Sequence, residues 1–353
     1  MERRNFLRNV SAGGLAFSLS SFIAPLGFNN ESLIENKDIL RPKHLSEGDT
    51  IGIISPSSAI FETEPYEIAK ESFEAMGLKV KMGKFVTAHY GHLAGTDEER
   101  AAEFNDMFRD PEVNAVIALR GGSGAARILD KIDYGLIAKN PKIFVGYSDI
   151  TALHLAIFAK TGLVTFHGPL ATSTWNDFTY AHFKEILFEA KAATLKNPTL
   201  IGDNLTQVSD RVSTITPGTA KGKLIGGNLS VLTGIMGSAY LPDWEGKILY
   251  LEEVGEKIYA IDRMMSQLHL GGVFEKISGF VFGHCTECEP GGSGYGSLTL
   301  EQVIDHYIKP LKIPAYTGAQ FGHISEIFTI PNGLEAELDA TNGLIQLLSP
   351  AVI

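Results

Sequence analysis

Short apolar runs alternate with amphipathic stretches over the first half of the chain. The apolar runs end at or near glycine or serine, have the length of buried strands, and lie at residues 50–54, 79–82, 113–119 and 142–145. Helical patterns follow at residues 64–76, 125–132 and 150–160. Thr96-Asp97-Glu98-Glu99 predicts a further helix start, because carboxylates stabilise the first helical turn. Strands that alternate with helices predict a parallel sheet covered by helices.

The pattern changes after about residue 175. Residues 191–217 are polar and irregular, which is typical of an interdomain linker. Short strand patterns separated by glycines follow at residues 222–225, 247–251, 277–283 and 334–338. They predict a smaller, β-rich and barrel-like second domain. The expected fold class is α/β, with an N-terminal parallel-sheet (Rossmann-like) domain over residues 41–190 and a C-terminal domain over residues 218–353.

The first residues have the layout of an export signal. Glu2-Arg3-Arg4-Asn5-Phe6-Leu7-Arg8 precedes an apolar, small-residue stretch from Val10 to Pro25, which is shorter than a membrane span. The paired arginines before Phe-Leu resemble a twin-arginine signal. We therefore expect residues 1–40 to be an export signal and linker, and the protein to be periplasmic. Ala24-Pro25 is a poor cleavage site, which leaves an uncleaved membrane anchor open, and an amphipathic first helix is the alternative.

Composition narrows the classes of partner and cofactor. The 353 residues are 44% hydrophobic and 20% charged, which is typical of a globular protein, and the length favours two domains. A formal net charge of −11 argues against a nucleic-acid partner, because phosphate binding needs clustered lysines and arginines. Both cysteines lie in Cys285-Thr286-Glu287-Cys288. A structural zinc site needs a second pair of ligands, so a local disulfide or two free thiols fits this motif better than a metal.

The segment Val145-Gly146-Tyr147-Ser148-Asp149 joins a predicted strand to a predicted helix. A serine on such a turn lies at the end of the sheet, near helix-start N–H groups that can stabilise an oxyanion, and is a candidate nucleophile. Helix capping by Ser148 or Asp149 is the competing interpretation, and the local sequence alone favours it. The Gly-x-Ser-x-Gly signature of α/β-hydrolases is absent, because Ile150 replaces the second glycine.

A glycine-rich segment, Arg120-Gly121-Gly122-Ser123-Gly124, follows the predicted strand at residues 113–119. Glycines let backbone amides approach a ligand closely or supply positive φ in a turn. The segment lacks the third glycine of a dinucleotide-binding loop, where Arg127 stands, and the Gly-Lys-Ser/Thr of a phosphate-binding loop. We interpret it as a loop that binds an oxyanion or the substrate backbone, with a structural turn as the alternative.

Candidates for an acid and a base lie in the second half of the chain. Glu252 and Glu253 end an apolar strand and, being adjacent, point to opposite faces, so one of them can face a cavity. An exposed surface position is the alternative for both. His323 follows a glycine in Gln320-Phe321-Gly322-His323, and a pKa near neutrality suits a histidine to proton transfer. Among the 10 histidines, His167 in Phe166-His167-Gly168-Pro169 is the nearest rival.

The order and spacing of these segments resemble the LD-carboxypeptidase family of serine peptidases, which also includes the microcin C self-immunity proteins. The resemblance runs from about Leu45 to the C-terminus. The matching segments are Asp49–Ser57, Tyr90–Thr96, Arg120–Gly124, Gly146–Thr151, His167–Pro169, Gly226–Leu229, Leu251–Glu256 and Gly322-His323. The chain departs from the family at Ser123, where an aromatic residue is common, and in the His-Ile-Ser sequence after Gly322.

The resemblance implies a Ser-His-Glu triad, in which Ser148 is the nucleophile, His323 the general base and Glu252 the residue that orients the base. The oxyanion hole of the family maps to the backbone N–H groups of Gly122 and Asp149. The N-terminal domain would then supply the nucleophile, and the C-terminal domain the acid and the base. The resemblance also implies a homodimer. It implies neither a metal nor a cofactor, since a serine supplies the nucleophile.

The reaction expected from the resemblance is hydrolysis of an L,D-amide bond that releases D-alanine from the murein tetrapeptide. Export fits this muropeptide substrate, because peptidoglycan lies outside the cytoplasm. Arg120 and Arg263 are candidates for binding the substrate carboxylate, and Trp175 for stacking on a base, although all three are residue types with common structural roles. A same-family hydrolase of peptidyl-nucleotide amides and a non-catalytic muropeptide-binding protein are the alternatives.

Overall fold

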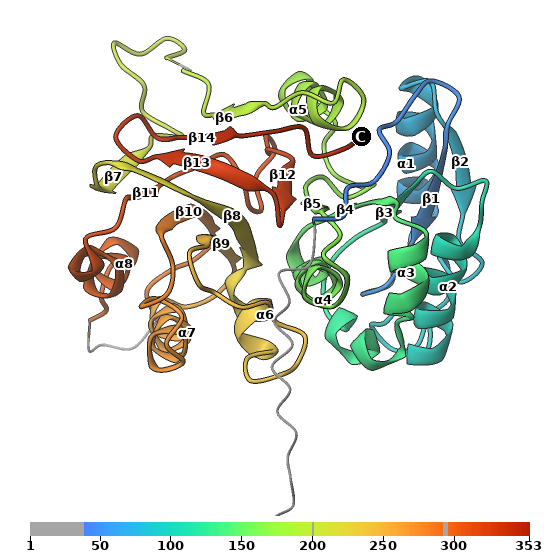
Figure 1. Cartoon of the computed structure of the whole chain (residues 1–353), viewed down its shortest axis with the longest axis horizontal. Helices are drawn as coiled ribbons and strands as arrows, with labels where there is room; N and C mark the ends of the chain where they lie inside the picture. The colour runs from blue at the N-terminus through green and yellow to red at the C-terminus, as the bar shows by residue number, and fades with distance from the viewer. Residues whose placement is uncertain (1–38, 200, 292–295) are drawn as a thin grey trace, which may run out of the picture. The chain divides into compact units, whose positions relative to one another are not determined.

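The computed structural model describes residues 39–199, 201–291 and 296–353, which belong to one compact unit, Lys37–Ile353. The predicted export signal and nearly all of its linker lie outside the described residues. In the described part of the chain, no helix is long and apolar enough to cross a membrane. Two β-sheets and their covering helices make up this unit (Figure 1).

The first sheet has six strands in the order β12–β5–β4–β3–β1–β2. These strands are β1 Thr50–Ile54, β2 Lys79–Met82, β3 Ala115–Ala118, β4 Ile143–Gly146, β5 Thr165–His167 and β12 Ile330–Asn332. Strands β1 to β5 are parallel, and β12 is antiparallel to β5. The strand order reverses between β1 and β3. In doubly wound sheets, ligands bind beyond the carboxyl ends of the strands at such a reversal.

Helices cover both faces of the first sheet (Figure 1). They are α1 Glu64–Ala75, α2 Asp97–Arg109, α3 Tyr134–Lys139, α4 Thr151–Thr161 and α5 Asp177–Leu187, with 3₁₀ turns η1 Ala125–Lys131 and η2 Ser148–Ile150. Val116 and Ala118 of β3 share a buried cluster with α2, α3 and α4. Ala115 and Ile117 of the same strand share the other cluster with α1 and α5. Burial on both faces explains why these strands form continuous apolar runs.

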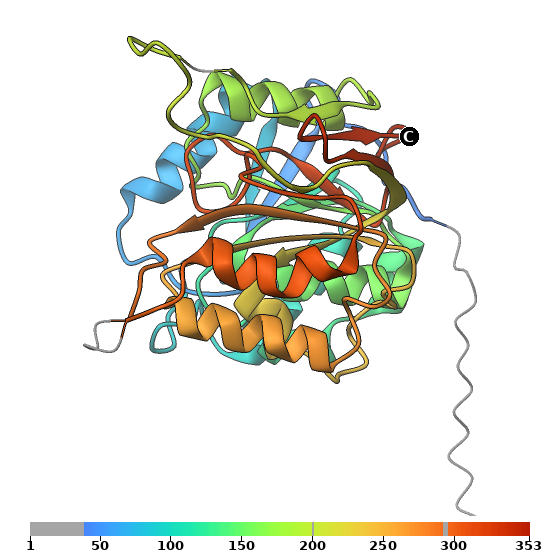
Figure 2. The ribbon, with the colours of Figure 1, turned by 90° about the vertical axis from the view of Figure 1, so that its left-hand side faces the viewer.

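The second sheet has eight strands in the order β6–β14–β13–β8–β9–β10–β11–β7. They are β6 Thr194–Lys196, β7 Ser213–Thr216, β8 Thr219–Asn228, β9 Ile248–Val254, β10 Gly279–Thr286, β11 Ala315–Thr317, β13 Glu335–Asp339 and β14 Leu344–Leu347. The helices of this part are α6 Leu229–Gly234, α7 Ile258–Leu270 and α8 Leu300–Ile308, followed by the turn η3 Lys309–Leu311. Figure 2 shows α7 and α8 side by side against this sheet. The fold class expected from the sequence is confirmed.

The segment predicted as a linker, residues 191–217, is part of the second sheet. It contributes β6 and β7, the two outermost strands of the second sheet. Thr214 of β7 donates a hydrogen bond to the carbonyl of Ala340, 2.8 Å away, beyond the end of β13. The sheet therefore curls so that one edge approaches its other half, as in a barrel. The division into domains at residues 190 and 218 stays a prediction.

The two sheets meet through buried polar contacts at the start of α4. The backbone N–H of Asn228, at the end of β8, donates to Thr151 Oγ1 at 2.9 Å. Gly227 has φ 137°, and a side chain there would come within 2.4 Å of Thr151 Oγ1. The C-terminal part of the chain also returns to the first sheet as β12, which pairs with β5. These contacts bring the carboxyl end of β4 next to the carboxyl end of β9.

Candidate active site

Ser148 lies on a tight turn between β4 and α4. The strand ends at Gly146, Tyr147 is extended, and Ser148 has φ 64°, in the left-handed region that non-glycine residues rarely adopt. No side-chain cap hydrogen bond forms at the start of η2 or of α4. The capping interpretation therefore fails, and the strained turn directs the Ser148 hydroxyl to the carboxyl end of the sheet, as a nucleophile requires.

His323 connects Ser148 to Glu252. Its Nε2 lies 3.1 Å from Ser148 Oγ, and its Nδ1 lies 2.8 Å from Glu252 Oε2. The ring of Tyr147 packs edge-to-face against the His323 ring, with centroids 5.0 Å apart. Residues that are 175 and 71 positions apart in sequence thus form one hydrogen-bonded series. If Nδ1 carries the proton and donates to Glu252, Nε2 is free to accept the Ser148 proton.

The loop that carries His323 is fixed against the end of β10. Thr286 Oγ1 donates to the His323 carbonyl at 2.9 Å, and the His284 N–H donates to the Phe321 carbonyl at 2.9 Å. Gly322 has φ 119°, and a Cβ there would lie 3.2 Å from Glu252 Oε2. A glycine is therefore needed next to His323 for the loop to come this close to the carboxylate.

Glu252 and Glu253 point to opposite sides of β9, as the strand alternation predicted. Both carboxyl groups are buried. Glu252 accepts from His323, whereas Glu253 accepts from the Ser230 N–H at 2.7 Å and from Asn228 Nδ2 at 3.1 Å. Burial raises the pKa of Glu253 to about 7, against the lowering effect of these hydrogen bonds. The exposed-surface alternative is therefore wrong for both residues.

The glycine-rich loop lies against Ser148. A Cβ on Gly121 would be 2.8 Å from Ser148 Cβ and 3.0 Å from its Oγ, so no larger residue fits there without a shift. Gly122 has φ 113°, and its N–H has no hydrogen-bond acceptor among the described residues. Asp149 is in the first turn of η2, where backbone N–H groups have no acceptor within the helix. Both N–H groups thus lie on segments next to the Ser148 hydroxyl.

The Asp149 side chain accepts hydrogen bonds from two loops near Ser148. Its Oδ2 accepts from Ser57 Oγ at 2.5 Å and from the Ala125 N–H at 2.7 Å. Burial raises the pKa of this carboxyl, and the two hydrogen bonds lower it. Ser57 follows β1, and Ala125 follows the glycine-rich loop. Ser57 lies in one of the family-like segments, but no local pattern in the sequence indicates this role.

A cavity of about 680 Å³ opens above Ser148. Its lining includes Ser148, His323, Gly122, Arg120 and Glu62, together with the apolar side chains of Ile60, Pro65, Ile68, Leu170 and Val254. Arg120 donates one hydrogen bond, to the Ala59 carbonyl at 3.1 Å. Arg263 is absent from the lining, and its guanidinium lies over the ring of Tyr259, 5.5 Å from the centroid. Of the two arginines, Arg120 is the one placed to meet a ligand at Ser148.

Two other aromatic candidates are part of the packing. Trp175 does not line the cavity; its ring packs edge-to-face against Phe73 and Phe183, with centroids 5.2 and 5.1 Å away. This packing corrects the interpretation of Trp175 as a base-stacking residue. His167 is buried against Tyr250 and Phe321, which lowers its pKa well below the usual value, and it makes no hydrogen bond to Ser148. His323, and not His167, is the histidine at the serine.

The cysteines form a local disulfide, Cys285–Cys288, at the end of β10. Of the interpretations that the sequence left open, the disulfide is the one that the structure contains. In the described ranges, no group of three or more His, Cys, Asp or Glu side chains is arranged to hold a metal ion. Thr286, between the two cysteines, is the residue that holds the His323 carbonyl.

Comparison with known proteins identifies the family. The profile of the LD-carboxypeptidase N-terminal domain matches residues 51–168, and that of the C-terminal domain matches residues 221–338. A probable murein peptide carboxypeptidase of Bacillus subtilis is 40% identical over 304 residues, covering 85% of this chain and 91% of the relative.

Solved structures agree with these matches. MccF in complex with glutamyl sulfamoyl guanosine superposes with a TM-score of 0.81 at 28% identity, covering 89% of this chain and 100% of that one. Muramoyltetrapeptide carboxypeptidase from Oxalobacter formigenes gives a TM-score of 0.72 at 30% identity, covering 84% and 97%. With both domain profiles matched in order, the chain belongs to the LD-carboxypeptidase family of peptidases.

Proposed function

We propose that this peptidase is a serine-type LD-carboxypeptidase that releases D-alanine from the murein tetrapeptide. The observation that carries the proposal is the hydrogen-bonded series Ser148–His323–Glu252 at a cavity of about 680 Å³. A hydroxyl, an imidazole and a buried carboxylate in this order are the groups that acyl transfer needs. The carboxypeptidase relatives support the choice of a C-terminal peptide bond.

The mechanism follows from the positions of these groups. His323 Nε2 accepts the proton of Ser148 as Oγ attacks the carbonyl carbon of the L,D-amide bond. The N–H groups of Gly122 and Asp149 donate to the oxyanion of the tetrahedral intermediate. The C–N bond then breaks, and His323 gives its proton to the leaving amine of D-alanine. Glu252 accepts from Nδ1 throughout and stabilises the imidazolium.

The second half of the reaction regenerates the serine. D-alanine departs and a water takes its place beside His323. His323 removes a proton from this water, which attacks the acyl carbon, and returns the proton to Ser148 Oγ as the ester bond breaks. The products are D-alanine and the shortened peptide. The reaction consumes one water and uses neither a metal nor a cofactor.

Arg120 is our proposed binding group for the substrate's terminal carboxylate. Its guanidinium lines the same cavity as Ser148 and makes a single hydrogen bond, so donors remain for a ligand. Carboxypeptidases must recognise a free carboxylate next to the scissile bond, and arginine matches a carboxylate with two parallel donors. This group would place the amide carbonyl of a terminal D-residue over Ser148.

A peptidyl-nucleotide amide is the second candidate substrate. The similarity to MccF, solved with glutamyl sulfamoyl guanosine, favours it. The packed position of Trp175 removes one aromatic surface on which we expected a base to stack. The murein relatives therefore make the tetrapeptide our first choice.

The proposal also includes export to the periplasm and assembly into a homodimer. A twin-arginine-type signal in residues 1–40 would bring the enzyme to the periplasm, where peptidoglycan lies. The homodimer implied by the family resemblance belongs to the same proposal. Cell fractionation and sedimentation of the exported protein test these two points.

The experiment that tests the function is mass spectrometry of defined muropeptides incubated with wild type and with Ser148→Ala. We expect loss of one alanine mass from tetrapeptides of the L,D type, and none in the variant, with both proteins showing the same thermal unfolding. A peptidyl-adenylate analogue serves as the competing substrate. Tight muropeptide binding without any release would identify a non-catalytic binding protein instead.

A further inference from the structure

Arg100 is the largest fully buried side chain in the described part of the chain, and its guanidinium is not exposed at all. It lies on α2, where Glu98, Asp106 and Arg109 are exposed. Burying a guanidinium costs several kcal/mol unless its N–H groups are paired. Its sequence position indicates no role, because an arginine in the first half of a helix is usually solvated.

The partners of Arg100 are backbone groups of two loops that surround Ser148. Nη1 donates to the Pro56 carbonyl at 2.6 Å and to the Gly124 carbonyl at 2.8 Å. Pro56 is in the loop after β1, and Gly124 is the last residue of the glycine-rich loop after β3. One guanidinium group therefore joins the two loops at the position where the strand order of the first sheet reverses.

Asp149 also forms hydrogen bonds with both of these loops. It accepts from Ser57, the residue after Pro56, and from Ala125, the residue after Gly124. Arg100 and Asp149 thus bind neighbouring residues on both loops. In the glycine-rich loop, Gly122, whose N–H is our proposed oxyanion donor, follows Gly121, which lies against Ser148, and precedes Gly124, which Arg100 binds.

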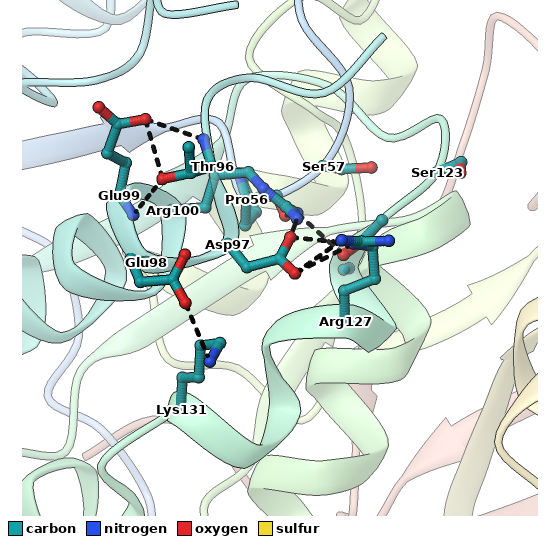
Figure 3. Close-up of polar contacts among 12 residues, drawn as sticks. Pro56, Ser57, Thr96, Asp97, Glu98, Glu99, Arg100, Ser123, Arg127 and Lys131 are labelled. Atoms are coloured by element: carbon teal, nitrogen blue, oxygen red, sulfur yellow. Dashed lines mark hydrogen bonds and ion pairs between the residues drawn. The ribbon is translucent and has the colours of Figure 1, made fainter. Parts of the chain in front are cut away.

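Arg100 is itself held by an ion-pair network (Figure 3). Asp97 accepts from Arg100 Nη2 at 2.5 Å, and from Nε and Nη2 of Arg127 at 2.9 and 2.8 Å. Arg127 is in η1, directly after the glycine-rich loop, and the capping box of Thr96 and Glu99 fixes the start of α2. The network therefore ties the glycine-rich loop to the rigid beginning of a helix.

We propose that Arg100 is a positioning residue for the reaction, which holds the Gly122 N–H at the place of the oxyanion. The inference rests on the proposed role of Ser148 and Gly122. No hydrogen bond joins Arg100 to Ser148, and its contacts with the loops are those to the carbonyls of Pro56 and Gly124. Loss of its two carbonyl contacts weakens the attachment of the glycine-rich loop, which then depends on Ser58 and Asp149. The effect should appear in the transition state, where the oxyanion exists, and not in substrate binding.

The test compares Arg100→Gln with Arg109→Gln. Arg109 is on the same helix and, like Arg100, pairs with an aspartate three residues earlier, but it is 57% exposed and contacts no active-site loop. For Arg100→Gln we expect kcat to fall about 10²-fold while KM changes less than about threefold. Arg109→Gln should match wild type in both. Thermal unfolding of each variant shows whether it is folded.

Labelling of Ser148 by a fluorophosphonate gives a readout that does not depend on the peptide substrate. The probe also forms a tetrahedral adduct with oxygen in the oxyanion hole, so Arg100→Gln should slow labelling by a similar factor. If wild type is labelled but releases no D-alanine, the proposed substrate is wrong and the labelling rates still decide the role of Arg100. If wild type is not labelled, the proposed nucleophile is wrong.

The conservative variant Arg100→Lys keeps the charge but has one nitrogen in place of the two that bind the carbonyls and Asp97. We expect it to fold and to recover only part of kcat. Wild-type kcat and labelling in either folded variant would overturn the proposal, as would a loss confined to KM. Unfolding of both variants would also count against it, because Arg100 would then serve stability alone.

Discussion

The two sides of the active site are built in different ways. On the nucleophile side, Ser148 and the glycine-rich loop follow strands of one sheet. Arg100 joins the glycine-rich loop to the loop after β1, and Asp149, next to Ser148, accepts from both of these segments. On the acid–base side, Glu252 ends a strand of the other sheet and His323 comes from a distant loop. In the proposed mechanism, the first side holds N–H groups in position, whereas the second side holds groups that exchange or stabilise protons.

Different kinds of substitution should therefore impair the two sides. A change of shape should damage the nucleophile side, because its task is to place a hydroxyl and two N–H groups. A change of charge with little change of shape should damage the acid–base side. Glu252 Oε1 is buried without a hydrogen-bond partner in the described structure, so this carboxylate depends on His323 for its compensation.

The largest effect is expected from a change of charge at Glu252. Glu252→Gln keeps the shape but cannot stabilise the imidazolium or fix the same tautomer of His323. We expect kcat for D-alanine release to fall about 10³- to 10⁴-fold, by analogy with amide substitution of the triad acid in other serine peptidases. Release of D-alanine is followed by mass spectrometry.

Glu253→Gln is the matched control for this prediction. The two residues are adjacent on β9, both are buried, and their side chains point to opposite sides. We expect Glu253→Gln to stay within about fivefold of wild-type kcat, since it lies away from His323. Equal losses in the two variants would contradict the separation of the acid–base side from the rest of β9.

A change of shape on the nucleophile side should have the next largest effect. Gly121→Ala adds a Cβ within 2.8 Å of Ser148 Cβ, so either the loop or the serine must move. Displacements of this kind cost about 10²-fold in rate when they misplace a reacting group. Gly135→Ala, in α3, is the control, because its nearest neighbour would be 3.4 Å away. Comparable activity of the two variants would show that the loop tolerates a shift.

A smaller effect is expected at Arg120, the first residue of the glycine-rich segment, whose proposed task is to bind the substrate carboxylate. Arg120→Gln removes the charge that we propose for the substrate carboxylate, and we expect KM to rise about tenfold with kcat nearly unchanged. A substrate whose terminal carboxylate is amidated should lose this difference between wild type and variant. If wild type cleaves the amidated substrate equally well, Arg120 does not bind the carboxylate.

Local sequence patterns predict most of the helices and turns on the nucleophile side. The helix predicted at residues 64–76 is α1 Glu64–Ala75, and the one predicted at 150–160 is α4 Thr151–Thr161. Helix α1 follows from apolar periodicity, because it buries one face, whereas residues 151–157 of α4 are all buried and form an almost continuous apolar run. The turn at Ser148 was visible because strand, glycine and helix are contiguous there.

Some features of the fold and the site depend on contacts between distant parts of the chain, and local sequence patterns do not predict them. The outer strands β6 and β7 were predicted as linker because edge strands are half exposed and polar, so their burial alternates weakly. Arg100 was missed because loops that are distant in sequence bury it. The pairing of Glu252 with His323 depends on a fold-level contact, and only the family resemblance pointed to it.

The smallest expected effect concerns stability, and it distinguishes the two faces of β9. Burial raises the pKa of Glu253 to about 7 from a usual value of 4.5, so the folded state binds this proton more tightly than the unfolded state. Between about pH 4.5 and pH 7 the folded protein therefore loses stability as pH rises, by an amount on the order of 3 kcal/mol from this group. Glu253→Gln should remove that loss. Urea unfolding at pH 5 and pH 8 measures it, with Glu245→Gln at an exposed position as the control. A wild type that gains stability relative to Glu253→Gln between these pH values would show that its hydrogen bonds outweigh its burial.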